Sequence, residues 1–146
     1  MKRFLWACAL MVGAFSIQAQ AQGERNYTEG NVTQVVAIRV TPGHFDQYVD
    51  YLASTWSKEQ AALKAAGLIL DYRMYSTTPR RPGDPDVYLT TTYENMAALD
   101  GFDDRADPVT TKALGSTREK DMKNMSDRNS YREIVGIELI REIKLK

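Results

Sequence analysis

The fold of this chain is decided by residues 32–67, which read VTQVVAIRVTPGHFDQYVDYLASTWSKEQAALKAAG. In residues 32–40 the side chains alternate with the two-residue period of a half-buried β-strand. The threonine, proline and glycine at 41–43 end the strand, and threonine and proline are favoured at the cap and the first position of a helix. Apolar side chains then recur at three- and four-residue steps from about 44 to 66, and Gly67 ends this amphipathic helix. The stretch therefore predicts a strand followed by a helix.

The region that follows predicts a β-hairpin. Residues 68–77 return to a two-residue period, and residues 86–93 are rich in the β-formers Val, Tyr and Thr. The intervening residues 79–85 read PRRPGDP, and these prolines can sustain neither a helix nor a strand ladder. Two strands joined by a loop of this size are typical of a hairpin.

The last third of the chain predicts further helix and one more strand. Residues 94–99 start a short helix that ends at Gly101. The pair Asp107-Pro108 has the cap-plus-proline signature of a new helix, which we expect to run to about residue 128 as a mobile surface helix because it is thinly apolar. Residues 131–145 are a long β-branched run with interspersed charges, which predicts a fourth strand.

The element order is therefore strand, helix, strand, strand, helix, strand. This split βαβ pattern predicts an α+β, ferredoxin-like βαββαβ fold, in which a four-stranded antiparallel sheet carries its helices on one face. We expect one such domain over residues 32–146, preceded by a polar, glycine-containing flexible leader at 22–31.

The first residues predict an export signal. A basic start at 1–3 precedes a short apolar run at 4–17 and an A-x-A site at 19–21, which are the parts of a secretory signal. The apolar run is shorter than the ~20 residues of a membrane-spanning helix. We therefore expect residues 1–21 to be cleaved as a signal peptide, and the protein to be periplasmic or secreted. No membrane span is expected after cleavage.

Cleavage changes what chemistry is available. The chain's only cysteine, Cys8, leaves with the signal, so disulfides and thiolate-held zinc are excluded from the mature protein. The signal also removes Lys2 and Arg3, which leaves slightly more acidic than basic side chains in residues 22–146. A near-neutral chain gives no electrostatic reason to expect a nucleic-acid partner.

Several stretches resemble one known superfamily. They are the TPG turn at 41–43, the AGL at 66–68, DYRMY at 71–75, GDP at 83–85 and YENMAAL at 93–99. With these, the span from about 35 to 100 resembles the antibiotic-biosynthesis-monooxygenase-like members of the dimeric α/β-barrel superfamily. The resemblance implies a homodimer whose sheets pair back to back, which would cover the sheet face that the helices leave bare.

The bare face supplies our candidate ligand-binding residues. In a dimeric barrel this face lines an enclosed cavity, where paired charges and tyrosine hydroxyls could orient a small aromatic or amphipathic ligand. Cross-strand ion pairs without a ligand are the alternative interpretation of the same residues. By the two-residue alternation, the candidates are Arg39, Asp71, Arg73, Tyr75, Tyr88, Thr90, Thr92 and Glu138.

His44 is the one candidate catalytic residue. It is the only histidine and lies in the first turn of the predicted helix, where the helix dipole disfavours its charged form and leaves it free to act as a base. An exposed surface histidine is the alternative. The aspartates at 100, 103, 104 and 107 lack calcium-loop spacing, so we predict no metal site, and no motif in the sequence calls for a cofactor.

Two functions are consistent with these patterns. The first is an exported small-molecule-binding protein, for which the resemblance implies a possible cofactor-independent monooxygenase or isomerase activity. The second is a non-catalytic dimerisation or interaction module of the bacterial cell envelope, in which the bare face serves only for pairing. An interior cavity favours the first function, and a filled interface favours the second.

Overall fold

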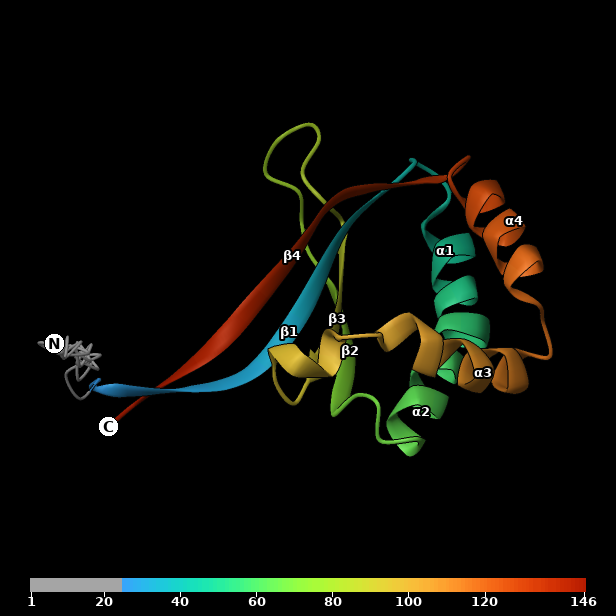
Figure 1. The fold of residues 1–146 in the computed structure, drawn as a ribbon. Coiled ribbons are helices and arrows are strands. Elements are labelled where there is room, and N and C mark those ends of the chain that lie inside the picture. The colour runs from blue at the N-terminus through green and yellow to red at the C-terminus, as the bar shows by residue number, and fades with distance from the viewer. Residues whose placement is uncertain (1–24) are drawn as a thin grey trace, which may run out of the picture.

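The computed structural model describes residues 25–146, so the predicted signal peptide lies outside the described residues. The described residues form four strands and four α-helices, with a π-helical turn at Leu52–Trp56 and a 3₁₀ turn at Met96–Leu99 (Figure 1). The elements are β1 (Tyr27–Val40), α1 (Phe45–Tyr51), α2 (Ser57–Ala65), β2 (Asp71–Ser76), β3 (Val87–Tyr93), α3 (Phe102–Leu114), α4 (Arg118–Arg128) and β4 (Arg132–Leu145).

The four strands form one antiparallel sheet in the order β2-β3-β1-β4. Ile38, near the end of β1, pairs with Val87 of β3 on one side and with Ile134 of β4 on the other. All four helices lie on the same side of this sheet (Figure 1). The predicted α+β, ferredoxin-like fold is therefore confirmed.

The core lies between the sheet and the helices. Ile38 and Val87 from the sheet and Tyr48 from α1 are almost fully buried in one apolar cluster. A second cluster joins α2 to α3, and there Tyr93 packs edge-on against Phe102 with 5.2 Å between ring centroids. Burial of these large side chains holds the helices on this face, because each contributes about 1.5–3 kcal/mol when removed from water. None of the described helices has the length and apolar character needed to cross a membrane.

The first strand is longer than the sequence pattern predicts. It begins at Tyr27, so residues 27–31 are extended rather than a flexible leader. They pair only with the end of β4, where Tyr27 lies opposite Leu145. Residues 27–31 of β1 and the paired end of β4 project from the rest of the sheet as a two-stranded ribbon (Figure 1). This ribbon is here called the arm. The prediction failed because the residues that order this segment lie more than a hundred positions away in the chain.

The first helix is one continuous rod with a wider turn inside it. Ser54 Oγ donates to the carbonyl oxygen of Asp50 at 2.7 Å, and Ser57 Oγ donates to that of Ala53 at 2.6 Å. Such side-chain bonds compete with the main-chain ladder and accompany the π-helical turn at 52–56.

The second helical region differs from the prediction. The helix α3 begins at Phe102, after Gly101 in a left-handed conformation (φ 59°), so Asp107 and Pro108 lie inside it and Asp107 is not a cap. The helix tolerates the proline because it packs on α2 through the buried Ala106. Gly115 (φ 62°) ends α3, and the Thr117 side chain accepts from the Lys120 amide to start α4. The single predicted helix is thus two helices.

The start of the second strand also differs. Residues 68–70 are an irregular turn rather than strand, and Ile69 is buried in the α2–α3 cluster although alternation placed it on the bare face. Leu70 and Met74 are about half exposed, because β2 is an edge strand. Alternation assigns the correct faces only where the chain is extended and paired.

Candidate functional site

The structure brings the predicted ligand-binding residues together on the sheet face opposite the helices. Arg73 lies opposite Thr90, Tyr75 opposite Tyr88, and Asp71 opposite Thr92. Residues that lie opposite each other in neighbouring strands share a face. Val35 of β1 lies opposite both Thr90 and Glu138, and Arg39 is an even number of residues further along β1. All of the predicted side chains therefore lie on the bare face. Their assignment to a ligand stays a prediction, whereas their placement is observed.

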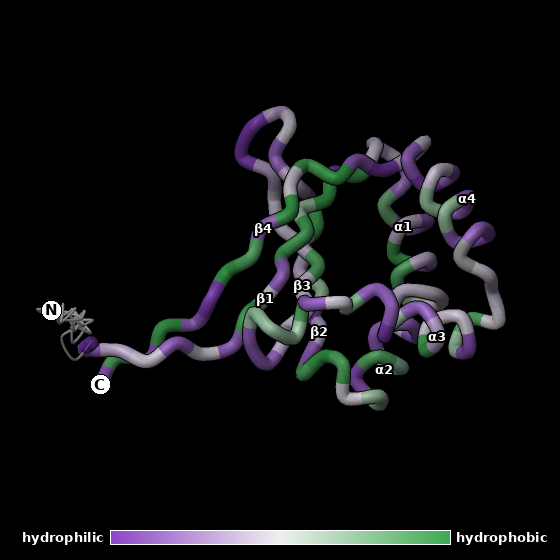
Figure 2. Tube along the Cα trace, viewed as in Figure 1, coloured by the Kyte–Doolittle hydropathy of each residue, from purple (hydrophilic) through white to green (hydrophobic). Residues whose placement is uncertain are grey.

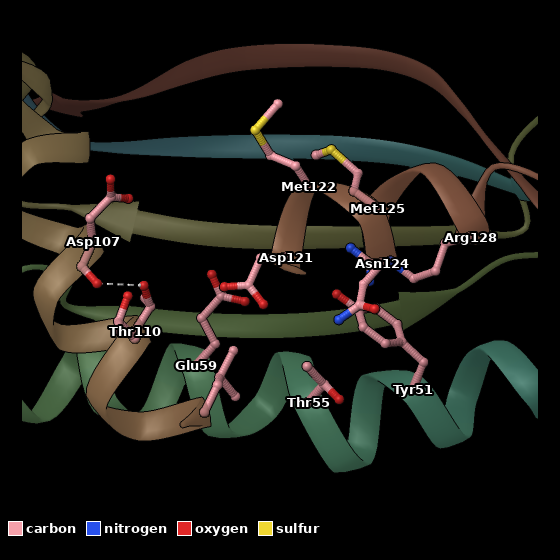
Figure 3. Close-up of a pocket in the computed structure, with 12 residues that line it drawn as sticks. Tyr51, Thr55, Glu59, Asp107, Thr110, Asp121, Met122, Asn124, Met125 and Arg128 are labelled. Atoms are coloured by element: carbon pink, nitrogen blue, oxygen red, sulfur yellow. Dashed lines mark hydrogen bonds between the residues drawn. The ribbon is translucent and has the colours of Figure 1, made fainter. Parts of the chain in front are cut away.

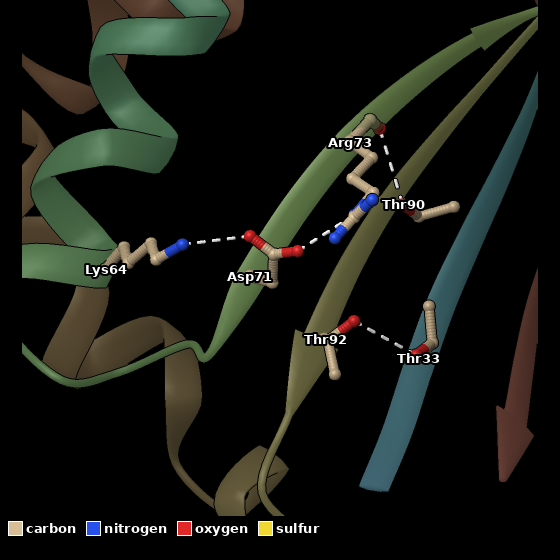
Figure 4. A network of polar contacts seen from close by, with 6 residues as sticks. All are labelled: Thr33, Lys64, Asp71, Arg73, Thr90 and Thr92. Carbon is tan, nitrogen blue, oxygen red and sulfur yellow. Dashed lines mark hydrogen bonds and ion pairs between the residues drawn. The ribbon is translucent and has the colours of Figure 1, made fainter. Parts of the chain in front are cut away.

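The charged side chains of this bare face form ion pairs, one of them with Lys64 of α2 (Figure 4). Asp71 accepts from Lys64 Nζ and from Arg73 Nε, each at 2.9 Å. The hydrogen bonds from Lys64 and then Arg73 lower the pKa of Asp71 to about 2. Arg39 donates to Glu133 at the other end of the face. In this structure the face therefore carries exposed ion pairs, whose contribution to stability is small because solvent screens them.

His44 lies apart from these residues. It is exposed at the start of α1, where its Nδ1 is 2.8 Å from Gln47 Oε1. Its ring stacks on Tyr131 with 6.0 Å between centroids. The structure places it neither on the bare face nor in the cavities described next, and its proposed catalytic role stays a prediction.

The helix side of the sheet contains two adjoining cavities that the sequence patterns did not reveal. The first, of about 220 Å³, lies between the first helix, α3 and α4, and is lined by Tyr51, Thr55, Glu59, Asp107, Thr110, Thr111, Leu114, Asp121, Met122, Asn124, Met125 and Arg128 (Figure 3). The second, of about 240 Å³, lies between the sheet and α2 and α3. Glu59, Asp107 and Thr110 line both. We call the two together the helix-side pocket.

Titratable groups gather in the first cavity. Burial, followed by the nearby Asp121 carboxylate, raises the pKa of Glu59, while Arg128 opposes this effect. Burial also raises the pKa of the Tyr51 phenol. The Arg128 guanidinium lies over the Tyr51 ring, 4.1 Å from its centroid. The cavity thus combines a carboxyl group that retains its proton to a higher pH than usual with a cation held on an aromatic ring.

The second cavity is lined by polar and apolar residues in about equal measure. Trp56, Tyr93 and Phe102 supply aromatic walls, and Leu63 and Leu89 supply aliphatic ones. On its polar side, the Thr91 hydroxyl donates to Gln60 Oε1 at 3.2 Å. Aromatic walls beside hydrogen-bonded polar groups are a combination that can hold an amphipathic small molecule.

One sequence signal for this pocket exists. Tyr51, Thr55 and Glu59 recur at four-residue steps on the first helix, so a polar stripe runs beside the apolar one. The stripe becomes a site only because Asp107 on α3 and Asp121 on α4 face it. The Asp107-Pro108 pair instead predicts a helix cap, and this prediction hid the relation between Asp107 and the stripe. Among residues 25–146, no group of three or more His, Cys, Asp or Glu side chains is placed to hold a metal ion.

Comparisons with known proteins agree with the fold. No family model matches the sequence, and no curated protein matches it. The structure is similar to HapK from Hahella chejuensis with a TM-score of 0.50 and 11% identity, over 76% of this chain and 91% of that one. It is also similar to a dimeric ferredoxin-like protein of unknown function from Thermobifida fusca, with a TM-score of 0.45 and 12% identity over 77% of this chain and 90% of that one.

A third solved structure is a conserved protein of unknown function from Bacteroides thetaiotaomicron described as a possible oxidoreductase. It has a TM-score of 0.42 and 15% identity over 80% of this chain and 99% of that one. At such low identities the likeness to HapK concerns the fold alone. Together with the strand order, it defines an α+β protein of the ferredoxin-like class.

Proposed function

We propose that this protein is an exported homodimer that binds a small aromatic or amphipathic molecule in the helix-side pocket. The observation that carries the proposal is the half-buried Glu59 carboxyl, which lines both adjoining cavities and has a raised pKa. Carboxyl groups with a perturbed pKa in a cavity wall are concentrated at functional sites. The π-helical turn beside it is a second such marker.

The chain contains a natural reporter for this pocket. Of its two tryptophans, Trp6 lies in the predicted signal and Trp56 lines the second cavity. We expect haem or one of a panel of aromatic acids, amides and quinones to quench the fluorescence of the exported protein and to raise its melting temperature. The Trp56→Phe variant should lose the quenching but keep the thermal shift. If no compound changes either signal, the interaction-module function is favoured instead.

The homodimer is proposed from the exposed edge of the sheet. The last strand, β4, is an edge strand, and its large apolar side chains are between 40% and 84% exposed. Hydrophobic and hydrophilic residues are interspersed along this strand (Figure 2). A long exposed apolar edge promotes association unless it is covered. A second copy of the chain suits it, because a two-fold axis would cover both edges with the same contact.

Back-to-back pairing of the two sheets, which the resemblance implies, would also place the predicted bare-face residues between the two subunits. Ile140 lies opposite Thr33 on that face and is about half exposed. We expect Ile140→Lys to convert a dimer to a monomer in analytical ultracentrifugation, because a charge would then have to be buried at the contact. The matched variant Glu119→Lys on the exposed side of α4 should remain dimeric. A monomeric parent protein would contradict the proposal.

A cofactor-independent oxygenase or isomerase activity is the second candidate. Glu59 favours it, because a carboxyl with a raised pKa is suited to remove and return a proton on a bound substrate. With a substrate identified from the panel, Glu59→Gln should lower kcat by at least about 100-fold, the usual contribution of a general base. An unchanged kcat would exclude this role while leaving binding in place.

A further inference from the structure

The second cavity of the helix-side pocket has acidic walls. Glu59, Asp103 and Asp107 are among the residues that line it, whereas no lysine, arginine or histidine side chain in the described part of the chain does. Asp103 is exposed at the start of α3, and burial followed by this carboxylate raises the pKa of the Tyr93 phenol in the cavity wall. Because apolar walls strengthen the field of nearby charges, Glu59 and Asp103 give the cavity a negative potential.

Glu59 lies where the two cavities adjoin, and the cation closest to it does not compensate for its burial. The Glu59 and Asp121 carboxyl groups extend toward one another between α2 and α4 (Figure 3). Burial and then Asp121 raise the pKa of Glu59, and although Arg128 opposes them, the net direction stays upward. None of the salt bridges among the described residues involves Glu59. A further positive charge beside Glu59 would therefore favour its ionised form.

A buried amide indicates a bound molecule independently of these charges. Gln60 is 7% exposed and lines the second cavity. Its Oε1 accepts from the Thr91 hydroxyl at 3.2 Å, while its Nε2 has no hydrogen-bond partner among residues 25–146. A buried donor without a partner is unfavourable, and an acceptor oxygen inside the cavity would satisfy it. The second cavity thus suits a molecule that carries such an oxygen on an apolar body.

The walls of the second cavity favour an aromatic ring and a positive charge. Trp56, Tyr93 and Phe102 line it, and the faces of such rings attract both other rings and cations. We infer that the ligand of the helix-side pocket is an aromatic amine with an oxygen substituent, whose ammonium group binds beside Glu59 while its ring lies between the aromatic walls of the second cavity. The inference rests on the proposed function and assigns the chemical class of its ligand.

Tyramine, tyrosol and 4-hydroxyphenylacetate test the inference, because they share a hydroxyphenyl ring and end in a positive, a neutral and a negative group. Isothermal titration of the exported protein at neutral pH should show tyramine binding at least about 10-fold more tightly than tyrosol, the effect of one charge-assisted hydrogen bond. The acid should bind most weakly of the three. Phenethylamine lacks the phenol oxygen and should bind more weakly than tyramine, because the Gln60 amide then gains no acceptor.

A matched pair of substitutions locates the ammonium group. Glu59→Gln removes a charge and keeps the shape of the side chain, so it should lower tyramine affinity about 10-fold and leave tyrosol affinity unchanged. Glu119→Gln makes the same chemical change at an exposed residue of α4 that lines neither cavity, and it should leave both affinities unchanged.

Each alternative outcome contradicts a separate statement. Tyrosol or 4-hydroxyphenylacetate binding as tightly as tyramine to the parent protein overturns the amine assignment without using any variant, and the proposed function stands. Equally tight binding of phenethylamine overturns the oxygen substituent. An unchanged tyramine affinity in Glu59→Gln, or the same loss in Glu119→Gln, overturns the position of the ammonium group. If none of these compounds binds while members of the earlier panel quench Trp56, the amine class is wrong. If nothing binds at all, the proposed function is wrong as well.

Discussion

The two faces of the sheet are formed by the same alternating strands, but their carboxyl groups have different environments. On the bare face, Asp71 is solvated and paired with two cations, and its pKa is lowered. On the helix side, Glu59 is half-buried beside another carboxylate, and its pKa is raised. The comparison teaches that charged residue types alone do not indicate a site. Whether a carboxyl is stabilised by partners or kept from water depends on what covers it.

The largest expected difference between the faces is in stability. Ile38 and Arg39 are consecutive in β1, but Ile38 is buried on the helix side and Arg39 lies on the bare face. We expect Ile38→Ala to lower the free energy of unfolding by about 3 kcal/mol, since it removes core contacts and leaves a cavity. Arg39→Ala should cost less than about 1 kcal/mol. Urea denaturation of both variants checks this, and similar losses would contradict the assignment of faces.

A smaller difference is expected at alkaline pH. Burial raises the pKa of Tyr48 from 10.0 to about 12, so the folded state keeps this proton more tightly than the unfolded chain does. The stability that depends on it is complete below pH 10 and is lost as the pH rises toward 12. Tyr48→Phe should flatten this loss in a series of melting temperatures. The control is Tyr75→Phe on the bare face, which should leave the alkaline loss in place.

The smallest expected effects come from the two carboxyls and have opposite signs. Because the folded pKa of Glu59 is raised, its contribution to stability falls as the pH rises above its ordinary value of 4.5, and Glu59→Gln should remove this fall. Because the folded pKa of Asp71 is lowered, its contribution is present above pH 3.8 and is lost as the pH falls toward 2. Asp71→Asn should remove that acid loss. Chemical denaturation across a range of pH measures both effects. If the two substitutions changed the pH dependence of stability in the same direction, the contrast between the two faces would be wrong.

Much of the bare face could be predicted because it depends on a local rule. A strand side chain changes face at every residue, so the placement of Arg73 or Thr90 needs only the knowledge that the segment is extended. The helix-side pocket could not be predicted in this way. Glu59, Asp107 and Asp121 come from three helices, and the alternation rule says nothing about how helices pack on one another.

By itself, then, the sequence determined the order of strands and helices, the apolar stripe on the first helix, and the charged residues that share the bare face. These follow from period, caps and turns, which act over a few residues. The tertiary structure alone decided that residues 27–31 become the arm, that Pro108 lies inside α3, and that Glu59 borders a cavity. Each of these depends on contacts between distant segments, whose packing free energy exceeds the local preferences of the chain.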